Sequence, residues 1–331
     1  MGKRILIVGG VAGGASAAAR ARRLDESAEI IIFEKGPHVS FSNCSLPFYL
    51  SGIVEDVDSL VLMDPEDFKS MYNIEVRVNN EVTKINRDKK TITVKDLVTG
   101  KEYEEFYDKL VLAPGASPIL PNSIEGVHNK NVFTVRNVVD IDNLNRYIKE
   151  NDVKDVAVVG GGFIGLEVAE NLRLAGLNVS LVEALNQVLA PFDYDMVQIL
   201  HKEITDHGVD LILEDGVKKI EDGYIELQSG KKLKAEAVVM AIGVKPETQL
   251  AKEAGLEIGE TGGIKVDHNF RTSDKDIYAV GDAVEVYNRL THKPTRLALA
   301  GPALRQARAA ADHMYNITVK NNGVIGSSVI K

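Results

Sequence analysis

The sequence predicts an α/β protein with two lobes, because one pattern of strand, glycine-rich loop, helix and strand occurs twice along the chain. The first copy runs from the apolar strand Arg4–Val8 through the glycines of residues 9–14 and an Ala-rich helix to a second strand that ends at Glu34. The second copy begins with Val156–Val159 and ends at Glu183. A chain of 331 residues is long enough to bury two cores, so each copy is expected to form its own lobe.

The glycines of both copies predict nucleotide binding. A tight turn without side chains lets backbone N–H groups and a helix N-terminus approach a pyrophosphate. The second copy matches G-x-G-x-x-G, and its glycine and helix-start residues are Gly160, Gly162, Phe163, Ile164 and Gly165. The first copy has a valine at the middle position, and its residues are Gly9, Gly10, Val11, Ala12, Gly13 and Gly14. We therefore predict two Rossmann-like nucleotide-binding domains.

Each copy ends in an acid that predicts a ribose contact. Glu34 and Glu183 close the second strand, about 20 to 25 residues beyond the glycines, where a carboxylate can accept hydrogen bonds from ribose hydroxyls. At Glu183 the negative charge also repels a 2′-phosphate. The second lobe is therefore expected to favour NADH over NADPH, without excluding NADPH.

Further strands predict that the second lobe is inserted into the first. Lys109–Ala113 runs into a Pro-Gly breaker, and Ala237–Ile242 closes the second lobe. Ile277–Ala283 resumes a strand, a turn and the start of a helix, while residues 75–98 alternate like a hairpin. The expected organisation is a discontinuous first domain of residues 1–118 and 246–331, interrupted by a second domain of residues 119–245.

Composition excludes several kinds of partner. A net charge of -9 and a pI of about 5.4 disfavour nucleic acid. No signal peptide and no apolar run of about 20 residues is evident, so we expect a cytoplasmic protein without a membrane segment. One cysteine excludes an internal disulfide, and the seven histidines lack metal-ligand spacing, so no metal is expected. His201 and His207 are expected to be surface residues on different faces of a helix.

With these residues in place, the chain resembles the FAD-dependent pyridine nucleotide-disulfide oxidoreductases, whose glutathione-reductase-like fold combines an FAD-binding and an NAD(P)-binding domain. The resemblance implies that FAD binds the Gly9–Gly14 loop, with further contacts from Glu34, Lys35, Ala113, Pro114, Gly115, Gly281 and Asp282. It places the Asp282 carboxylate on the ribityl chain of the flavin. NADH is expected on the Gly160–Gly165 loop, together with Glu167, Glu183 and Gly243.

The segment of residues 40–48, Ser-Phe-Ser-Asn-Cys-Ser-Leu-Pro-Phe, resembles the coenzyme A-disulfide reductases and the NADH-dependent persulfide or polysulfide reductases. The resemblance implies that Cys44 is the redox-active thiol that attacks a small-molecule disulfide or persulfide. We expect Cys44 and Pro47 in the first turn of a helix whose dipole favours the thiolate. Without a second cysteine, Cys44 must form a mixed disulfide with an external thiol or be oxidised to a sulfenic acid or persulfide. The alternative is a buried, inert cysteine.

For coenzyme A as substrate or adduct, the resemblance assigns contacts to Ser16, Arg20, Arg23, Ser40 and Asn43. Arg20 and Arg23 lie one helical turn apart and can bind phosphates together. The alternative is a solvated basic face that also includes Arg22. The sequence leaves the two interpretations even, with Arg23 the better candidate for a phosphate contact.

Two rival functions remain open at this point. The first is an NADH oxidase or peroxidase that works through a Cys44 sulfenate, a class that Ala12 and Asn43 disfavour by resemblance. The second is a flavin-bearing redox sensor that does not turn over a substrate. The family is homodimeric through a further C-terminal domain, and the chain ends at Lys331, where that domain should begin. We therefore expect the dimerisation domain to be absent, so that a homodimer cannot be assumed.

Overall fold

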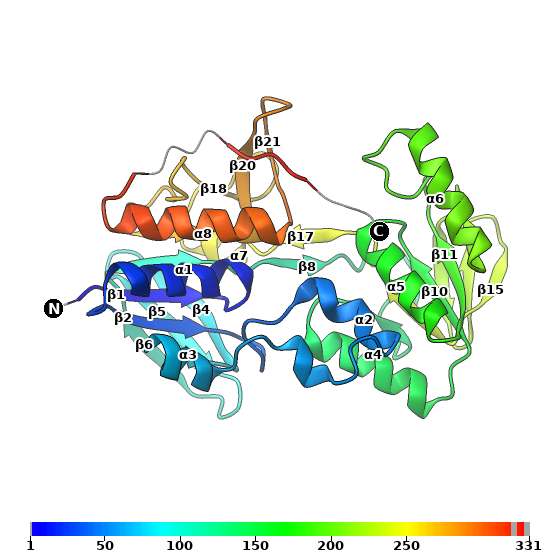
Figure 1. The fold of residues 1–331 in the computed structure, drawn as a ribbon, viewed down its shortest axis with the longest axis horizontal. Helices are drawn as coiled ribbons and strands as arrows, with labels where there is room; N and C mark the ends of the chain where they lie inside the picture. The colour runs from blue at the N-terminus through cyan, green and yellow to red at the C-terminus, as the bar shows by residue number, and fades with distance from the viewer. Residues whose placement is uncertain (1, 319–322, 328–331) are drawn as a thin grey trace. The chain divides into compact units, whose positions relative to one another are not determined.

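The computed structural model describes residues 2–318 and 323–327, and its chain divides into two compact units (Figure 1). Unit 1 comprises Met1–Phe41, Val61–Ala116 and Pro246–Lys331, and unit 2 comprises Ser42–Leu60 and Ser117–Lys245. The chain passes between the units near the expected crossings at 118/119 and 245/246. The segment Ser42–Leu60, expected in the first domain, groups with unit 2 instead, because its helix α2 (Leu46–Leu50) packs against α4 (Val138–Glu150) and α5 (Phe163–Leu174).

Unit 1 is built on a five-stranded parallel sheet in the order β19-β7-β1-β2-β3. These strands are β1 (Arg4–Val8), β2 (Glu29–Phe33), β3 (Glu75–Arg77), β7 (Lys109–Leu112) and β19 (Ile277–Ala279). Parallel strands covered on both faces are expected to be continuously apolar, and the interior of β1 is fully buried. Helix α1 (Ala12–Leu24) lies beside α8 (Ala300–Met314), as Figure 1 shows.

Unit 2 repeats this plan with a second parallel sheet in the order β12-β11-β10-β16-β9. Its strands are β9 (Val132–Phe133), β10 (Asp155–Val159), β11 (Asn178–Val182), β12 (Val209–Ile212) and β16 (Ala237–Met240). In each unit the central strand, β1 or β10, leads into the glycine-rich loop and the following helix. The predicted α/β class with two repeated lobes is therefore confirmed.

The repeat extends to an inserted sheet, which separates β3 from β7 in unit 1 and β12 from β16 in unit 2. Unit 1 inserts the antiparallel sheet β4-β5-β6, formed by β4 (Asn80–Asn86), β5 (Thr91–Asp96) and β6 (Glu102–Phe106). Unit 2 inserts β13-β14-β15, formed by β13 (Val217–Glu221), β14 (Tyr224–Leu227) and β15 (Lys232–Lys234). The sequence repeat did not reveal this second level of similarity, because the inserted strands share no glycine pattern.

The remaining elements are short, apart from the helix α6 of unit 2. They are η1 (Asn43–Ser45), η2 (Val57–Leu60), α3 (Pro65–Tyr72), β8 (Ala116–Pro118), α6 (Tyr194–Asp206), β17 (Val244–Pro246), α7 (Gln249–Glu253), β18 (Ile264–Lys265), η3 (Gly281–Ala283), β20 (Val284–Asn288) and β21 (Lys293–Thr295).

Two expected elements differ in the structure. Residues 75–77 do not belong to the hairpin but form β3, which pairs in parallel with β2, so the hairpin itself spans residues 80–96. After β19, residues 281–283 form a single 3-10 turn that leads into strand β20 rather than into a helix. The alternation of apolar and polar residues in Val284–Asn288 has the period of a strand, which explains this difference.

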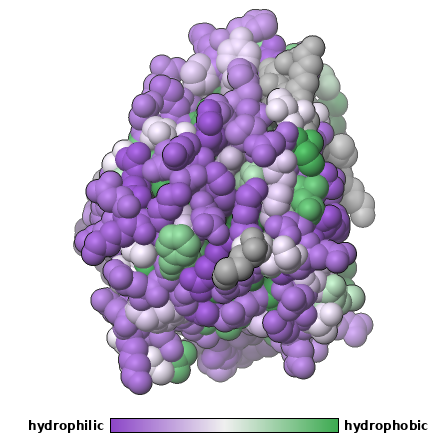
Figure 2. Space-filling model, turned by 90° about the vertical axis from the view of Figure 1, so that its left-hand side faces the viewer, coloured by the Kyte–Doolittle hydropathy of each residue, from purple (hydrophilic) through white to green (hydrophobic). Residues whose placement is uncertain are grey.

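The surface carries no broad apolar area on the face drawn in Figure 2. That face is largely hydrophilic, with hydrophobic residues that lie apart from one another. Within residues 2–318 and 323–327, no helix has the length and apolar character that crossing a bilayer requires.

Candidate nucleotide and cysteine sites

The glycine loop of unit 1 is held in a shape that side chains would prevent. After β1 the chain turns at Gly9, whose φ is 92°, a value that favours glycine. A Cβ atom on Gly9 would lie 2.1 Å from the Ala113 carbonyl oxygen, and one on Gly14 would lie 1.8 Å from the Gly9 carbonyl oxygen. Both positions therefore require glycine, because the strand and the helix approach each other too closely for a methyl group.

The loop of unit 2 has the same construction. Gly160 has a φ of 110°, and a Cβ atom there would lie 2.5 Å from the Ala241 carbonyl oxygen. A Cβ atom on Gly165 would lie 1.9 Å from the Gly160 carbonyl oxygen. The predicted equivalence of the two motifs is thus an equivalence of backbone geometry.

The middle position distinguishes the two loops. A Cβ atom on Gly162 would meet no atom within 4 Å, so no protein contact accounts for a glycine at this exposed N-cap position of α5. Open space in front of a helix N-terminus is what an approaching pyrophosphate requires. Val11, the N-cap residue of α1, stands at the matching position with a φ of -97°, which any residue can adopt. The valine therefore needs no left-handed backbone, although its ψ of -143° differs from the -176° of Gly162.

The two terminal acids are anchored in the same way. The Glu34 carboxylate accepts hydrogen bonds from the backbone N–H groups of Gly10 (2.8 Å) and Gly36 (2.9 Å). The Glu183 carboxylate accepts them from Gly161 (2.7 Å) and Leu185 (2.9 Å). A carboxylate has about four acceptor positions, so each group keeps capacity for a further donor such as a ribose hydroxyl. The ribose contact itself stays a prediction.

A further part of the repeat follows each acid, and the sequence analysis missed it. Val39 and Val188 each lie against the second glycine of their loop, where a Cβ atom would come within 2.5 Å and 2.8 Å of the valine side chain. The next residues, Ser40 and Leu189, are left-handed, with φ values of 50° and 47°. Their N–H groups donate to the carbonyl oxygen of that same glycine, at 2.9 Å and 2.8 Å. The available signal was a valine five residues after each acid.

The other residues expected at the first nucleotide lie at the carboxyl ends of the strands of unit 1, the usual ligand edge of such sheets. Ala113, Pro114 and Gly115 follow β7, and a Cβ atom on Gly115 would meet no atom within 4 Å. Gly281, in the turn after β19, donates its N–H to the Oε1 atom of the buried Gln306 at 2.7 Å. Asp282 is half-buried in the same turn, and Lys35 is exposed beside Glu34.

In unit 2, the corresponding edge gathers the residues expected at the second nucleotide. Gly243 follows β16 and is exposed, with a φ of 124°. Phe163 and Ile164 are exposed at the start of α5, and the ring of Phe163 meets that of Phe192 edge to face, with centroids 6.2 Å apart. Burial, followed by the charge of Glu170, raises the pKa of the half-buried Glu167 carboxyl.

Cys44 is exposed, so it is not the buried cysteine of the alternative interpretation, while its reactivity stays a prediction. It lies in the 3-10 turn η1, ahead of the α-helix rather than within its first turn, so the expected position requires correction. Helix α2 begins two residues later, and Pro47 falls in its first turn, where a missing N–H costs nothing. The hydroxyls of Ser42 and Ser45 bond to each other at 2.8 Å on either side of the thiol-bearing residue.

The cysteine segment is attached to unit 2 by two side-chain hydrogen bonds. The Nδ2 atom of Asn43 donates to the Arg136 carbonyl oxygen at 3.0 Å. The Ser51 hydroxyl donates to the Oδ1 atom of Asn171 at 2.6 Å, and Asn171 is fully buried on α5. These contacts explain why a segment that precedes most of the first domain in sequence groups with unit 2.

The basic residues of α1 have three different environments. Arg20 is paired with Asp312 of α8, with 2.7 Å between Nε and Oδ1. Arg22 is buried and donates to the backbone carbonyl oxygens of Tyr72 and Asn73, so it is no part of a solvated basic face. Arg23 is exposed, and no hydrogen bond or ion pair ties it to another residue that the structure describes. Ser16 is half-buried one turn before Arg20.

His201 is not the surface residue that the sequence predicts. It is half-buried on α6, and its Nε2 atom accepts a hydrogen bond from the Val188 N–H at 3.2 Å. Burial lowers the pKa of its imidazole. His207, at the end of the same helix, is exposed as expected. Across the described ranges, no group of His, Cys, Asp and Glu side chains could hold a metal ion.

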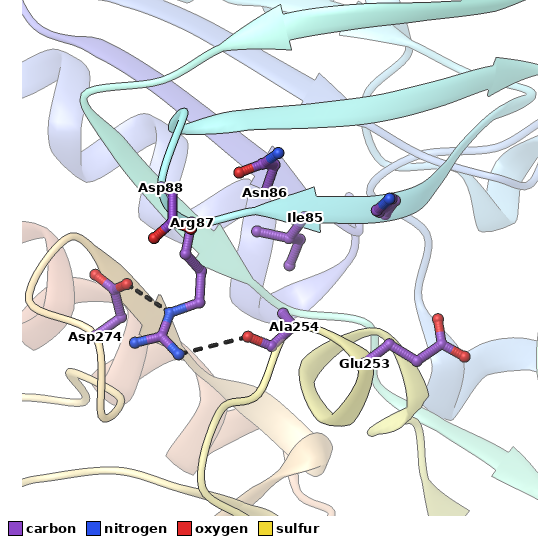
Figure 3. Close-up of a pocket in the computed structure, with 8 residues that line it drawn as sticks. Ile85, Asn86, Arg87, Asp88, Glu253, Ala254 and Asp274 are labelled. Atoms are coloured by element: carbon purple, nitrogen blue, oxygen red, sulfur yellow. Dashed lines mark hydrogen bonds and ion pairs between the residues drawn. The ribbon is translucent and has the colours of Figure 1, made fainter.

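A polar depression in unit 1 lies at the turn between β4 and β5, and none of the predicted site residues lines it (Figure 3). Arg87 spans it, donating to the Asp274 carboxylate at 2.8 Å and to the Ala254 carbonyl oxygen at 3.5 Å. Because the Arg87 guanidinium already donates to protein acceptors, we interpret this depression as a contact between the β4–β5 turn and residues 254 and 274, and not as a ligand site.

Comparison with known proteins identifies the relatives of the chain. The family model described as "Pyridine nucleotide-disulphide oxidoreductase" matches residues 3–310. A protein named "Coenzyme A disulfide reductase" from Staphylococcus aureus (strain JH9) is 35% identical over 329 residues, which are 99% of this chain and 74% of that protein.

Two solved structures are similar over the whole chain. The structure titled "Crystal structure of reduced Bacillus anthracis CoADR-RHD" has a TM-score of 0.98 and 46% identity, covering 100% of this chain and 60% of that one. An NAD-dependent persulfide reductase from A. fulgidus has a TM-score of 0.95 and 35% identity, covering 99% and 62%. The chain thus spans less than two thirds of the length of either protein.

Proposed function

Because the chain belongs to the pyridine nucleotide-disulphide oxidoreductase family, we propose that it passes electrons from NADH through FAD to Cys44, which reduces a sulfur substrate. Proteins named as a coenzyme A disulfide reductase and as an NAD-dependent persulfide reductase are similar over 99% of the chain, which supports this substrate class. Since those relatives are longer, the activity of the whole protein is part of the proposal.

The residues of unit 1 fit an FAD site. The first glycine loop leads into the N-terminus of α1, where the N-cap residue Val11 makes no side-chain cap hydrogen bond, and Glu34 keeps acceptor positions for a ribose. Residues 113–115 and 281–282 add the backbone and the carboxylate that the family uses for the flavin and its ribityl chain. When bound, FAD supplies a two-electron centre that accepts hydride and returns an electron pair to sulfur.

The residues of unit 2 fit NADH. Three features lie at the carboxyl ends of the strands in this sheet. They are the open space at Gly162, the exposed start of α5, and Glu183, whose carboxylate is held by two backbone N–H groups. The negative charge of Glu183 disfavours a 2′-phosphate, so NADH is proposed as the donor, with NADPH the weaker alternative.

Cys44 performs the chemistry on sulfur. Its thiolate attacks one sulfur of a disulfide, the S–S bond breaks, and the departing thiolate takes a proton while a mixed disulfide with Cys44 forms. An electron pair that originates from NADH then breaks the mixed disulfide, and a second thiol leaves after protonation. One NADH and one proton thus convert a disulfide into two thiols. A persulfide is handled by the same attack and yields a thiol and hydrosulfide.

Coenzyme A, as its disulfide or persulfide, is the proposed substrate. Arg23 carries the strongest case for a phosphate contact, because it is exposed while Arg20 is already paired with Asp312. Ser16, Ser40 and Asn43 complete the proposed contacts. We place the reaction in the cytoplasm, where thiols are kept reduced.

The observation that carries the proposal is the exposed Cys44 in a chain with two nucleotide loops of one construction. The test is an anaerobic NADH titration followed in the visible flavin spectrum, with the mass of Cys44 measured before and after. Bleaching of the flavin with loss of a coenzyme A-sized adduct, absent in Cys44→Ser, is the expected result. Absence of flavin, or an unmodified Cys44 and NADH consumption that requires oxygen, contradicts the proposal and favours the oxidase alternative.

A further inference from the structure

His201 makes a contact that links helix α6 to the segment of residues 184–193, which follows β11. Its Nε2 atom lies 3.2 Å from the Val188 backbone nitrogen. A backbone N–H can only donate, so Nε2 must be the unprotonated nitrogen of a neutral imidazole whose proton is on Nδ1. A doubly protonated imidazolium has no acceptor and would leave the buried Val188 N–H without this partner.

Val188 in turn touches the second glycine of the nucleotide loop. A Cβ atom on Gly161 would come within 2.8 Å of the Val188 side chain, so the two residues are in close contact. The next residue, Leu189, donates its N–H to the Gly161 carbonyl oxygen at 2.8 Å, while Gly161 donates its own N–H to Glu183 at 2.7 Å. Thus both polar backbone groups of Gly161 are held by the chain that runs from Glu183 to Leu189.

We propose that neutral His201 is a positioning residue that holds residues 184–193 against the Gly160–Gly165 loop, and that its protonation releases this segment and weakens the binding of NAD(H). The inference rests on the proposed function insofar as it takes this loop as the NAD(H) site. His201 acts through Val188 and does not itself touch the nucleotide in this account.

The surroundings of His201 favour the neutral form. Its helix carries Lys202 and Glu203, which pair with Asp206 and His207, and Asp193 is the N-cap residue of the helix. The packed strand β12 contributes Asp210, and the segment beyond β11 contributes Glu183. Burial alone, and no charge among the described residues, lowers the pKa of His201.

The sign of the pH dependence follows from that direction. A histidine whose pKa is lowered in the folded protein stabilises the fold fully above its ordinary pKa of about 6.5, and this contribution is lost as the pH falls through the lowered value. The segment is therefore expected to be held at neutral pH and released in acid. Releasing one hydrogen bond of this kind weakens NAD(H) binding about five- to tenfold.

The first unit supplies an internal comparison. Val39 and Ser40 hold Gly10 as Val188 and Leu189 hold Gly161, but neither α2 nor α3, the helices between β2 and β3, carries a histidine, and the histidine of this segment is His38 beside Val39. Retention of the flavin should therefore be independent of the titration of His201. A change confined to the second nucleotide would distinguish the effect of His201 from general acid destabilisation.

The test measures the dissociation constant of NAD⁺ by calorimetry between about pH 7.5 and pH 5, a range that spans the ordinary histidine pKa of about 6.5. NAD⁺ leaves the flavin oxidised, so binding is read without turnover. The variants are His201→Gln, which keeps an acceptor but does not titrate, and His201→Leu, which removes the acceptor. His207→Gln on the same helix is the matched control. Flavin content and protection of the Val188 amide from hydrogen exchange are followed in parallel.

The wild type and His207→Gln are expected to bind NAD⁺ about five- to tenfold more weakly in acid, with unchanged flavin content. His201→Gln should keep the neutral affinity throughout, and His201→Leu should be weak at every pH. The proposal is overturned if His201→Gln titrates like the wild type, or if the wild type shows no pH dependence. If flavin-loaded protein binds no NAD⁺ at any pH, the assignment of the loop fails and the proposed function fails with it.

Discussion

The glycine loops of the two units differ most where their sequences differ, at the middle position. Val11 and Gly162 are both N-cap residues, with φ/ψ values of -97°/-143° and -80°/-176°, and a Cβ atom on Gly162 would meet no atom within 4 Å. The outer glycines are needed for contacts inside the protein, since a Cβ atom at Gly9 or Gly160 would collide with a carbonyl oxygen. The comparison teaches that contacts inside the protein require the outer glycines, whereas no protein contact requires the middle glycine of the second loop.

The sharpest test of that comparison is to replace the first glycine of each loop. Gly9→Ala and Gly160→Ala combine a left-handed strain with a backbone collision, which together cost about 2–5 kcal/mol. We expect Gly9→Ala to lose flavin, and Gly160→Ala to keep flavin but lose reduction by NADH, measured as flavin per chain and as bleaching.

Gly176→Ala is the matched control, because its φ is 89° and a Cβ atom there meets nothing within 4 Å. It has the strain without the collision. If Gly160→Ala behaves no worse than this control, the collision is not what requires glycine in the loop.

The acids should show the next largest effect. Glu34→Gln and Glu183→Gln each replace one of two accepting oxygens by an amide NH2 group that cannot accept, which costs about 1.5–3 kcal/mol per charged hydrogen bond. Glu34→Gln is expected to bind flavin more weakly. Glu183→Gln is expected to bind NADH more weakly and to lose its preference for NADH over NADPH. This preference is measured as the ratio of the kcat/KM values for the two nucleotides. Equal ratios in wild type and variant would remove Glu183 from nucleotide selection.

Exchange of the middle residues should separate folding from binding. Gly162→Val adds a side chain that meets no protein atom, so the free energy of unfolding should change by less than about 0.5 kcal/mol. NADH binding should nevertheless weaken about tenfold, because Gly162 is exposed and a valine there fills the open space before α5, whereas Val11 of the first loop is half-buried. Val11→Gly, the reciprocal change, is expected to leave flavin bound. Unchanged NADH affinity in Gly162→Val would contradict the placement of the nucleotide.

Substitutions at the left-handed residues that follow Val39 and Val188 should have the smallest effect, and we consider Ser40 as the example. Ser40→Gly suits a φ of 50° and is expected to change the free energy of unfolding by less than about 1 kcal/mol. Ser40→Val should destabilise by about 1–2 kcal/mol, because a branched side chain disfavours this conformation. Chemical denaturation of the two variants measures the difference, and equal midpoints would show that the turn is not strained.

Much of the fold followed from the sequence, because buried parallel strands and glycine turns leave local signals. Arg4–Val8 and Asp155–Val159 lie within a residue of the predicted bounds. Residues 75–77 were assigned wrongly, since a short strand carries no local sign of whether its partner is its neighbour or the distant β2. The placement of Cys44 ahead of α2 likewise depends on how a single turn closes.

The sequence by itself determined the two repeated lobes, the two acids and the single cysteine, because residue types and their spacing are enough to identify each of them. The tertiary structure alone decided which of these groups are already engaged. Within the described residues, Arg20 is paired with Asp312 and Arg23 is not paired, Asn43 bonds to Arg136, and His201 bonds to Val188, although the partners lie far along the chain or on another element. Packing between elements determines such partners. A hydrogen bond between two elements produces no periodic pattern in the sequence from which it could be predicted.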